Sequence, residues 1–257
     1  MSLGGEVAEA ARRWAQRQEG RGIPPDILAR APADPWVHDP VDFAAPQSAA
    51  DTPSRDAATT LLGEGGVVLD VGCGGGAAAF ALDRVTAVTG VDRQRDMLDA
   101  FAAAAWARGL PHRIVLGSWP EVADTAGHAD VVVCHHVLHN VVDLPPFLTA
   151  LTTAARRGVV VEMFTEHPLA WLDPLWQRFH DLQRPPSATV DDARAVLAEL
   201  GYAAAVVRWE RAQLPRQDPA WVVRRLCLPA ERTSEIAGAL AEMPPRPREV
   251  ATLSWRS

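Results

Sequence analysis

The residues of this chain best suited to binding a ligand are four glycines that follow an apolar run containing Asp70. The glycines are Gly72, Gly74, Gly75 and Gly76. Glycine has no Cβ, so a glycine-rich backbone lets a ligand approach closely. We expect a buried parallel strand at 67–71, a glycine turn, and then the start of an alanine-rich helix whose free N–H groups face the ligand. This arrangement predicts a nucleotide or nucleoside pocket at the carboxyl end of a strand.

Two classes of cofactor fit such a turn. The pattern Gly72-x-Gly74-x-x-Ala77 matches the fingerprint of dinucleotide-binding proteins. Asp70 favours the other class, because its carboxylate would repel a pyrophosphate but would offset a cationic ligand or orient nearby amides.

A second acid lies where a nucleoside sugar would need it. Asp92 ends the apolar run TAVTGVD, about 20 residues after Gly72, which is the spacing of an acid that binds ribose hydroxyls. Asp92 could also cap a helix that we expect over 93–107. Both roles are compatible, and neither separates the two cofactor classes.

The next chemically active group is the sequence Cys134-His135-His136-x-x-His139, which follows a predicted strand at 130–133. Neutral imidazole can accept a proton from a hydroxyl or amine, so His136 and His139 are candidate catalytic residues. A metal site is the weaker interpretation, because no acid at close spacing completes a ligand set. We therefore predict no bound metal.

The motif LDVGCGGG, taken with Asp92, resembles the class I S-adenosylmethionine-dependent methyltransferase family. The resemblance spans roughly Asp51 to Val161. It implies a Rossmann-like fold, S-adenosylmethionine as cofactor and S-adenosylhomocysteine (SAH) as product. The cofactor-binding residues that it indicates are Arg55, Asp70, Gly72, Cys73, Gly74, Asp92, Arg93, Met97, Gly117, Ser118, Trp119, Cys134 and His135.

Three of these positions are less regular. Many members of the family carry an acid for the adenine amine where this chain has Ser118. We expect Ser118 and its backbone to contact the adenine, with Trp119 as a stacking face. Arg55 precedes the first motif and is a candidate for the cofactor carboxylate, although a surface arginine is an equal interpretation.

Composition restricts the partners and the compartment. The chain has 257 residues and a formal charge of −7, and nucleic-acid binding proteins usually show a basic footprint instead. Three widely spaced cysteines suggest reduced thiols in the cytoplasm, and no stretch is long enough to span a membrane. We expect a small-molecule methyl acceptor, no nucleic acid and no membrane; the oligomeric state is not predicted.

The order of the patterns predicts an α/β fold. We expect a Rossmann-like sheet of about seven strands, mostly parallel with the last strand antiparallel, helices on both faces and helical cover elements. An N-terminal helical cover would occupy 1–50 and the methyltransferase domain 51–257. Insertions at about 164–188 and 212–247 would cover the substrate pocket.

The predicted reaction is direct in-line displacement, in which an acceptor nucleophile takes the sulfonium methyl group. Such a reaction depends mainly on positioning, so no fixed catalytic triad is expected. Two alternatives remain at this point. The chain could be an NAD(P)-dependent oxidoreductase, or a catalytically silent methyltransferase-like domain that only binds.

Overall fold

The sheet of this protein has seven strands in the order β3-β2-β1-β4-β5-β7-β6. The computed structural model describes residues 7–36, 51–211, 217–244 and 248–257. The strands are β1 (Gly66–Val71), β2 (Val85–Asp92), β3 (His112–Leu116), β4 (Ala129–His135), β5 (Ala155–Phe164), β6 (Ala205–Arg211) and β7 (Arg248–Trp255). Strands β1 to β5 pair in parallel, whereas β7 pairs antiparallel with both β5 and β6. The predicted mostly parallel, Rossmann-like sheet with a reversed last strand is therefore confirmed.

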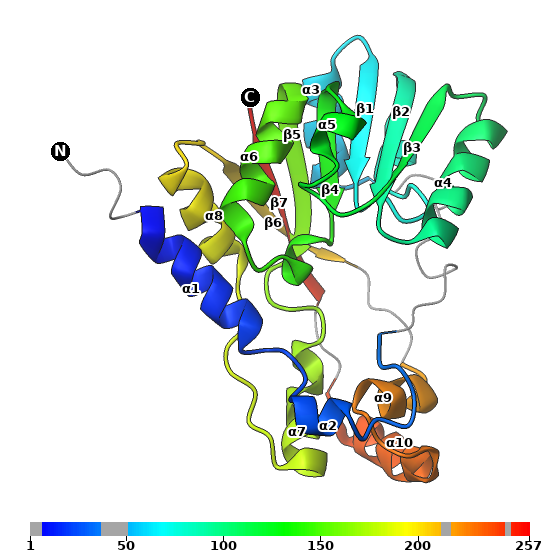
Figure 1. The fold of residues 1–257 in the computed structure, drawn as a ribbon, viewed down its shortest axis with the longest axis vertical. Helices are drawn as coiled ribbons and strands as arrows, with labels where there is room; N and C mark the ends of the chain where they lie inside the picture. The colour runs from blue at the N-terminus through cyan, green and yellow to red at the C-terminus, as the bar shows by residue number, and fades with distance from the viewer. Residues whose placement is uncertain (1–6, 37–50, 212–216, 245–247) are drawn as a thin grey trace.

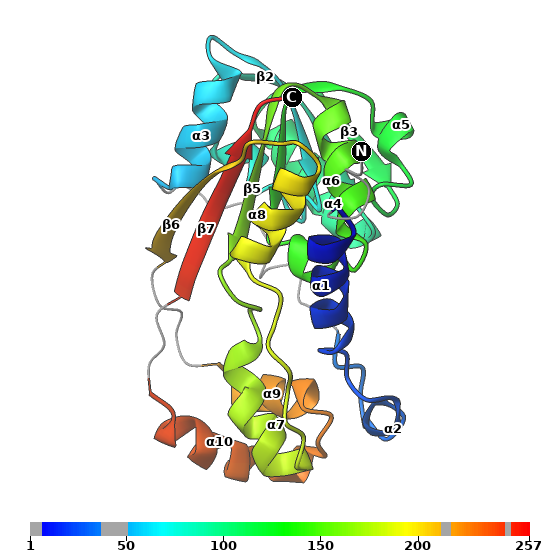
Figure 2. The same ribbon diagram turned by 90° about the vertical axis from the view of Figure 1, so that its left-hand side faces the viewer.

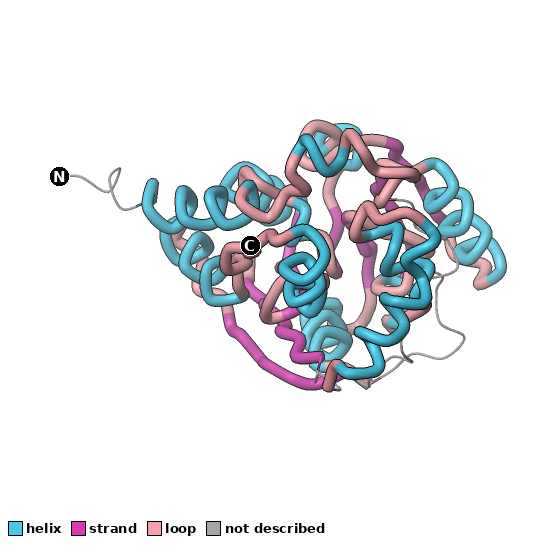
Figure 3. The backbone as a smooth tube through the Cα atoms, turned by 90° about the horizontal axis from the view of Figure 1, so that it is seen from below, coloured by secondary structure: helices cyan, strands magenta, loops and turns pink. Residues whose placement is uncertain are grey.

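Helices lie on both sides of the strands, as Figure 3 shows from below. They are α1 (Val7–Glu19), α2 (Pro25–Leu28), α3 (Pro53–Leu62), α4 (Arg95–Ala107), α5 (Ala123–Ala126), α6 (Leu144–Ala154), α7 (Asp173–His180), α8 (Val190–Glu199), α9 (Pro219–Arg225) and α10 (Thr233–Glu242). Short 3-10 turns are η2 (Ala79–Ala81), η3 (Leu138–Asn140), η4 (Ala170–Leu172) and η5 (Ala230–Arg232). Local chemistry fixes several helix starts: the side chains of Thr52, Thr189 and Asp218 each accept a backbone N–H of the first turn.

Alternation along the central strands separates two apolar cores. Leu69 and Val71 of β1 face a core shared with α1, α6 and α8. Val68, the residue before Leu69, faces the opposite core, which α3 and α4 cover. A strand buried on both faces is mostly apolar, which is why β1 lacks the polar alternation of a surface strand and carries a single acid, Asp70.

The predicted α-helix directly after the glycine turn is wrong. The chain forms only the 3-10 turn η2 there, and β2 begins at Val85. The segment from Gly76 to Val85 is too short for a glycine turn, a full helix and a return to the sheet. The N–H groups and dipole of an α-helix are therefore not available at this turn, and the ligand-binding argument must rest on the turn itself.

A helical lobe lies beyond the carboxyl end of β5. Figures 1 and 2 both show α2, α7, α9 and α10 together below the sheet. Leu172 and Trp176 pack there against Val222 and Ile236, with Ile27 of α2 joining the same apolar cluster. The described residues of the two predicted insertions thus meet in one lobe. The predicted cover segment falls partly at 37–50, outside those residues, and the division at residue 50 stays a prediction.

The described helices include none with the length and apolar character needed to cross a membrane.

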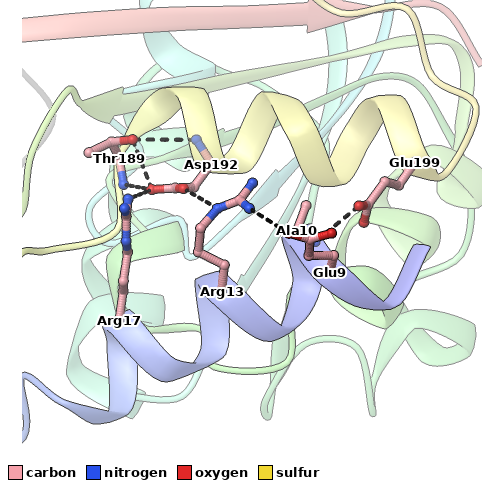
Figure 4. A network of polar contacts seen from close by, with 7 residues as sticks. All are labelled: Glu9, Ala10, Arg13, Arg17, Thr189, Asp192 and Glu199. Carbon is pink, nitrogen blue, oxygen red and sulfur yellow. Dashed lines mark hydrogen bonds and ion pairs between the residues drawn. The ribbon is translucent and has the colours of Figure 1, made fainter. Parts of the chain in front are cut away.

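Helix α1 is clamped to α8 by a polar network (Figure 4). Asp192, whose side chain is 7% exposed, closes the capping box of Thr189 and also pairs with Arg13 at 3.1 Å and with Arg17. At the other end of the two helices, the Glu199 carboxylate accepts the Ala10 N–H at 3.0 Å. Burial raises the pKa of Asp192, but hydrogen bonds from Thr189 and Arg13 and the charge of Arg17 lower it more, so the net pKa is below its usual range.

We expect Asp192→Ala to lower the free energy of unfolding by about 2 kcal/mol, because the change removes a helix cap and leaves two arginines without their acid. Chemical denaturation followed by circular dichroism measures the loss. Because the pKa of Asp192 is depressed on folding, the deficit shrinks as the solution is acidified through the carboxyl range.

Asp191→Ala is the matched control. Asp191 is the neighbouring acid, is 67% exposed, and pairs only with the half-exposed Arg208 among the described residues. Equal losses for the two variants would mean that the clamp contributes nothing specific.

Candidate active site

The glycine turn is shaped first by packing within the protein. The N–H groups of Gly72 and Cys73 both donate to the carbonyl of Val91, at 2.8 and 3.0 Å, which ties the end of β1 to the end of β2. Gly72 has a φ of +71°, and a Cβ at this position would collide with Val137 in the loop after β4. Glycine is therefore required here by the approach of another loop, in addition to any ligand.

Asp92 fastens the same turn from the neighbouring strand. Its Oδ2 accepts the N–H of Gly74 at 3.0 Å, and its Oδ1 accepts the N–H of Gln94 at 2.9 Å. A carboxylate has about four acceptor sites, so both oxygens retain capacity for ligand hydroxyls. The predicted acid of the second strand thus lies directly against the predicted glycine turn.

Asp70 holds the segment that replaces the expected helix. It is 1% exposed and accepts the N–H of Ala79 at 3.2 Å. Burial raises the pKa of Asp70 to about 8, and the nearby charge of Asp92 adds to this effect. Of the two roles expected for Asp70, the structure shows the orienting of an amide.

The remaining predicted cofactor residues divide into two groups. Arg93, Gly117 and Ser118 follow β2 and β3 at the same edge as Asp92, and Arg93 and Ser118 are exposed. Met97 is buried in the first turn of α4. The contacts of these four residues with a cofactor stay predictions.

The second group is engaged within the protein. Trp119 is 9% exposed in the core, and its indole N–H donates to the Phe147 carbonyl at 3.3 Å, so little of its ring is left for stacking. Arg55 bridges Asp51, Asp83 and the Ala81 carbonyl at 2.6 to 2.8 Å, which fastens α3 to the chain after η2. These placements differ from the predicted stacking face and carboxylate ligand.

Cys73 and Cys134 are both buried, at 5% and 0% exposure. Burial raises the pKa of both thiols above their usual range, so they remain protonated. Each therefore acts as a small apolar side chain beside the turn.

The ends of β4 and β5 bring His135 and His136 against Glu162, an acid to which the sequence analysis assigned no role. Glu162 is 4% exposed, and its Oε1 lies 2.9 Å from Nε2 of His136. Burial raises the pKa of Glu162, but the His136 hydrogen bond, the charges of both histidines and a Ser54 hydrogen bond lower it, to about 2. Its sequence signal was an acid inside the apolar run GVVVEMF, where a charge is costly unless it is paired.

His136 is held in an unusual conformation. Its φ of +59° is left-handed, which is uncommon for a residue other than glycine and often occurs at functional sites. Its ring stacks on Phe164 at 4.8 Å. Nε2 also lies 2.8 Å from the Arg211 guanidinium, which can only donate, so this nitrogen cannot accept from Arg211 and donate to Glu162 in the same tautomer. We assign the Nε2–H to Glu162, whose carboxylate can only accept. In this tautomer the buried Nδ1, which has no hydrogen-bond partner within the described residues, is a proton acceptor.

The other two histidines are held neutral. Burial lowers the pKa of His135 to about 4 and that of His139 to about 3. Nε2 of His139 lies 3.1 Å from the Phe164 carbonyl, which fixes this nitrogen as the donor. A group with so low a pKa is a weak base near neutrality, so His139 is better suited to orient a ligand than to accept a proton.

Helix α1 positions the loop that carries these histidines. The buried indole of Trp14 donates to the Val141 carbonyl at 2.7 Å, and the amide of Gln18 donates to the Leu138 carbonyl at 2.9 Å. The clamp between α1 and α8 thus extends to η3. The sequence predicted α1 but not this contact.

A cavity of about 200 Å³ opens beside η3. His139 and Asn140 line it from the sheet side, whereas Leu172 and Trp176 line it from the helical lobe. A second hollow, near Leu61 and Trp255, lies at the opposite end of the sheet from the glycine turn and is lined by only one titratable side chain, Arg256. Within the described chain, no set of three or more His, Cys, Asp and Glu side chains is arranged to hold a metal ion.

We expect Glu162 to make stability depend on pH. The fall of its pKa from the ordinary 4.5 to about 2 corresponds to about 3 kcal/mol of folding free energy. Because the folded pKa is the lower one, this contribution is present above about pH 4.5 and is lost toward pH 2. The stability gap between the wild type and Glu162→Gln, measured by urea titration, should therefore narrow by about that amount between pH 7 and pH 2.5.

Glu166→Gln provides the control, since Glu166 is exposed four residues later on the same segment. The free energy of unfolding of Glu166→Gln should stay close to that of the wild type at every pH. A pH-independent gap for Glu162→Gln would show that the carboxylate is not preferentially ionised in the folded protein.

Comparisons with known proteins agree with this geometry. Residues 68–158 match the family model of a methyltransferase domain. Coclaurine N-methyltransferase, bound to N-methylheliamine and SAH, is 12% identical over 99% of this chain and 87% of its own, with a TM-score of 0.52. The YcgJ protein of Bacillus subtilis is 17% identical over 79% and 95%, with a TM-score of 0.51. No curated protein sequence matches this chain.

A protein from echinomycin biosynthesis, where a disulfide bond becomes a thioacetal group, is 19% identical over 90% of both chains, with a TM-score of 0.52. At such identities these likenesses establish the fold alone. Residues 68–158 of this chain match a methyltransferase domain, the kind of domain that the resemblance implied.

Proposed function

We propose that this protein transfers a methyl group from S-adenosylmethionine to a small-molecule acceptor. The observation that carries the proposal is the hydrogen bond from Gly74 to Asp92, which joins the glycine turn to the acid of the next strand inside a domain that matches methyltransferases. It gives a nucleoside sugar a carboxylate at the point where the backbone is most open.

The residues around this bond fit the cofactor. Asp92 has acceptor capacity for both ribose hydroxyls, and the glycine turn is proposed to take the rest of the nucleoside. Ser118 and Met97 are proposed to flank the adenine, and the buried Asp70 lies under the turn. When bound, S-adenosylmethionine would supply an activated methyl group and a good leaving group.

The acceptor's proton is the task left to the protein. We assign proton acceptance to Nδ1 of His136, because Nε2 is committed to Glu162. The buried carboxylate stabilises the imidazolium that forms and fixes the ring through its hydrogen bond. Glu162 is thus a positioning residue, and His139 is proposed to orient the acceptor from the cavity wall.

The size of the cavity supports a small acceptor. A volume of about 200 Å³ is below the usual range for drug-sized ligands, and the formal charge of −7 opposes a nucleic-acid partner. All three cysteines are free, which agrees with the proposed cytoplasmic location. The proposed N-terminal cover and the two insertions would close over this cavity.

We expect Asp92→Ala to weaken SAH binding by about 1 to 3 kcal/mol, because the ribose hydroxyls lose their acceptor. Isothermal titration calorimetry of the full chain with SAH measures the effect. Asp99→Ala, which removes an exposed acid of α4 paired to Arg95, should leave the affinity unchanged. Binding of NAD in place of SAH would instead support the oxidoreductase alternative.

For His136→Asn we expect methyl transfer to fall about 100-fold while SAH affinity stays constant, as expected for loss of a general base. The assay follows labelled methyl from S-adenosylmethionine into small molecules of a host-cell extract. The exposed His128 supplies the control His128→Asn. A wild-type protein that binds SAH yet labels nothing would identify a silent binding domain.

A further inference from the structure

The cavity beside η3 has a chemical character that the proposed methyl transfer does not require. Three arginines line it: Arg21 at the end of α1, Arg184 after α7 and Arg225 of α9. They come from segments far apart in the sequence and meet only where the helical lobe closes on the sheet. A surface arginine can remain solvated, but Arg21 and Arg225 are only 8% and 4% exposed. Such buried charge needs a compensating partner.

The protein itself supplies part of the compensating negative charge. Arg21 forms a two-pronged pair with Asp173, at 2.7 and 3.1 Å. Asp34 lies near enough to Arg225 to favour its charged form. Arg184 donates to the carbonyls of Gly22 and Arg21 and, within the described residues, is in no ion pair. Among the described residues, Arg184 is therefore the guanidinium of this cavity that has no acid in hydrogen-bonding contact.

The charges of these arginines also act on the two histidines of the cavity. Burial, followed by the charges of all three arginines, lowers the pKa of His167 to about 4. His139 packs edge-to-face against His167 at 5.5 Å, and its Nδ1 is buried with no hydrogen-bond partner among the described residues. Both rings are neutral near pH 7, so they do not add to the charge but can hydrogen-bond a ligand. Because Nε2 of His139 donates to the Phe164 carbonyl, its Nδ1 is an acceptor and can pair with a donor group of a ligand, such as a hydroxyl, but not with a carboxylate oxygen.

Aromatic faces hold two of the arginines in place. The Arg184 guanidinium lies 5.2 Å from the ring centre of Trp176, and that of Arg225 lies 5.4 Å from that of Trp36. A stacked guanidinium presents its N–H edges in a fixed plane, which suits a planar anion. The volume of about 200 Å³ is that of about seven waters at 30 Å³ each, enough for a single-ring compound.

We propose that this cavity binds the methyl acceptor and that the acceptor is a planar organic carboxylate, its anionic group facing Arg184 and Arg21. The identification of the ligand as an acceptor rests on the proposed methyl transfer, whereas the anion site is supported by the geometry of the cavity itself.

One wall of the cavity belongs to the loop that packs on the glycine turn. His139 and Asn140 line this wall, and Val137, two residues before His139, lies so close to Gly72 that no side chain fits there. The loop that would contact the acceptor therefore also contacts the turn that is proposed to hold the cofactor.

Calorimetry with matched acid and amide pairs tests the assignment. The probes are benzoate, 4-hydroxybenzoate and indole-3-carboxylate, each with its neutral amide, titrated into the full chain alone and with SAH present. We expect at least one acid to bind tenfold or more tightly than its amide. In Arg184→Gln this preference should fall to threefold or less, and Arg184→Lys should restore part of it. Arg178→Gln, which changes an exposed arginine of the same lobe paired with Glu242, should keep the full preference.

Each outcome decides the inference. Equal binding of acid and amide, no binding of any acid, or an unchanged preference in Arg184→Gln would overturn it. Tighter binding of phenyl phosphate than of benzoate would replace the carboxylate by a phosphate and overturn the stated class. The SAH titration is interpreted separately. If SAH binds but the acids bind no more tightly than their amides, only this inference is refuted. If the acids bind more tightly than their amides but SAH does not bind, the proposed methyl transfer is refuted and an anion site is left. A melting temperature for each variant close to that of the wild type shows that the comparison is made on folded protein.

Discussion

The candidate site depends on how closely the loop after β4 approaches the end of β1. Val137 occupies the space that a side chain at position 72 would need, so the contact exists only because residue 72 is glycine. Through this contact, the turn that would hold a nucleoside and the loop that carries His136 and His139 form one rigid edge of the sheet. The strand order places β1 and β4 side by side at the switch point of the sheet, where open α/β proteins bind their ligands.

The N-terminal helix has a structural role beyond covering the pocket. Its outer turns are fixed to α8 by Asp192 and Glu199, and its inner face holds η3 through Trp14 and Gln18. The last residues of the same segment deliver Arg21 to the cavity. The same N-terminal segment therefore stabilises the sheet domain, positions the histidine loop and contributes an arginine to the proposed acceptor site.

Burial and its compensation determine the chemical state of Asp70 and Glu162. Asp70 is driven toward its neutral form, whereas Glu162 stays ionised because His136 donates to it. The two acids behave in opposite ways because the single backbone hydrogen bond to Asp70 does not offset its desolvation, whereas the histidines and Ser54 more than offset that of Glu162. In the cavity the same rule keeps His139 and His167 neutral and leaves the positive charge on the arginines.

The sequence by itself determined the mostly parallel sheet with its reversed last strand and the pairing of the glycine turn with Asp92. These features depend on local periodicity and on turn chemistry, which neighbouring residues specify. The helix expected after the turn failed because propensity cannot show how soon the chain must return to the sheet. Glu162, the placements of Trp119 and Arg55, and the arginine cavity were decided only by tertiary structure. Their partners lie more than 20 residues away in the chain, so burial and charge neutralisation arise only when distant segments pack together.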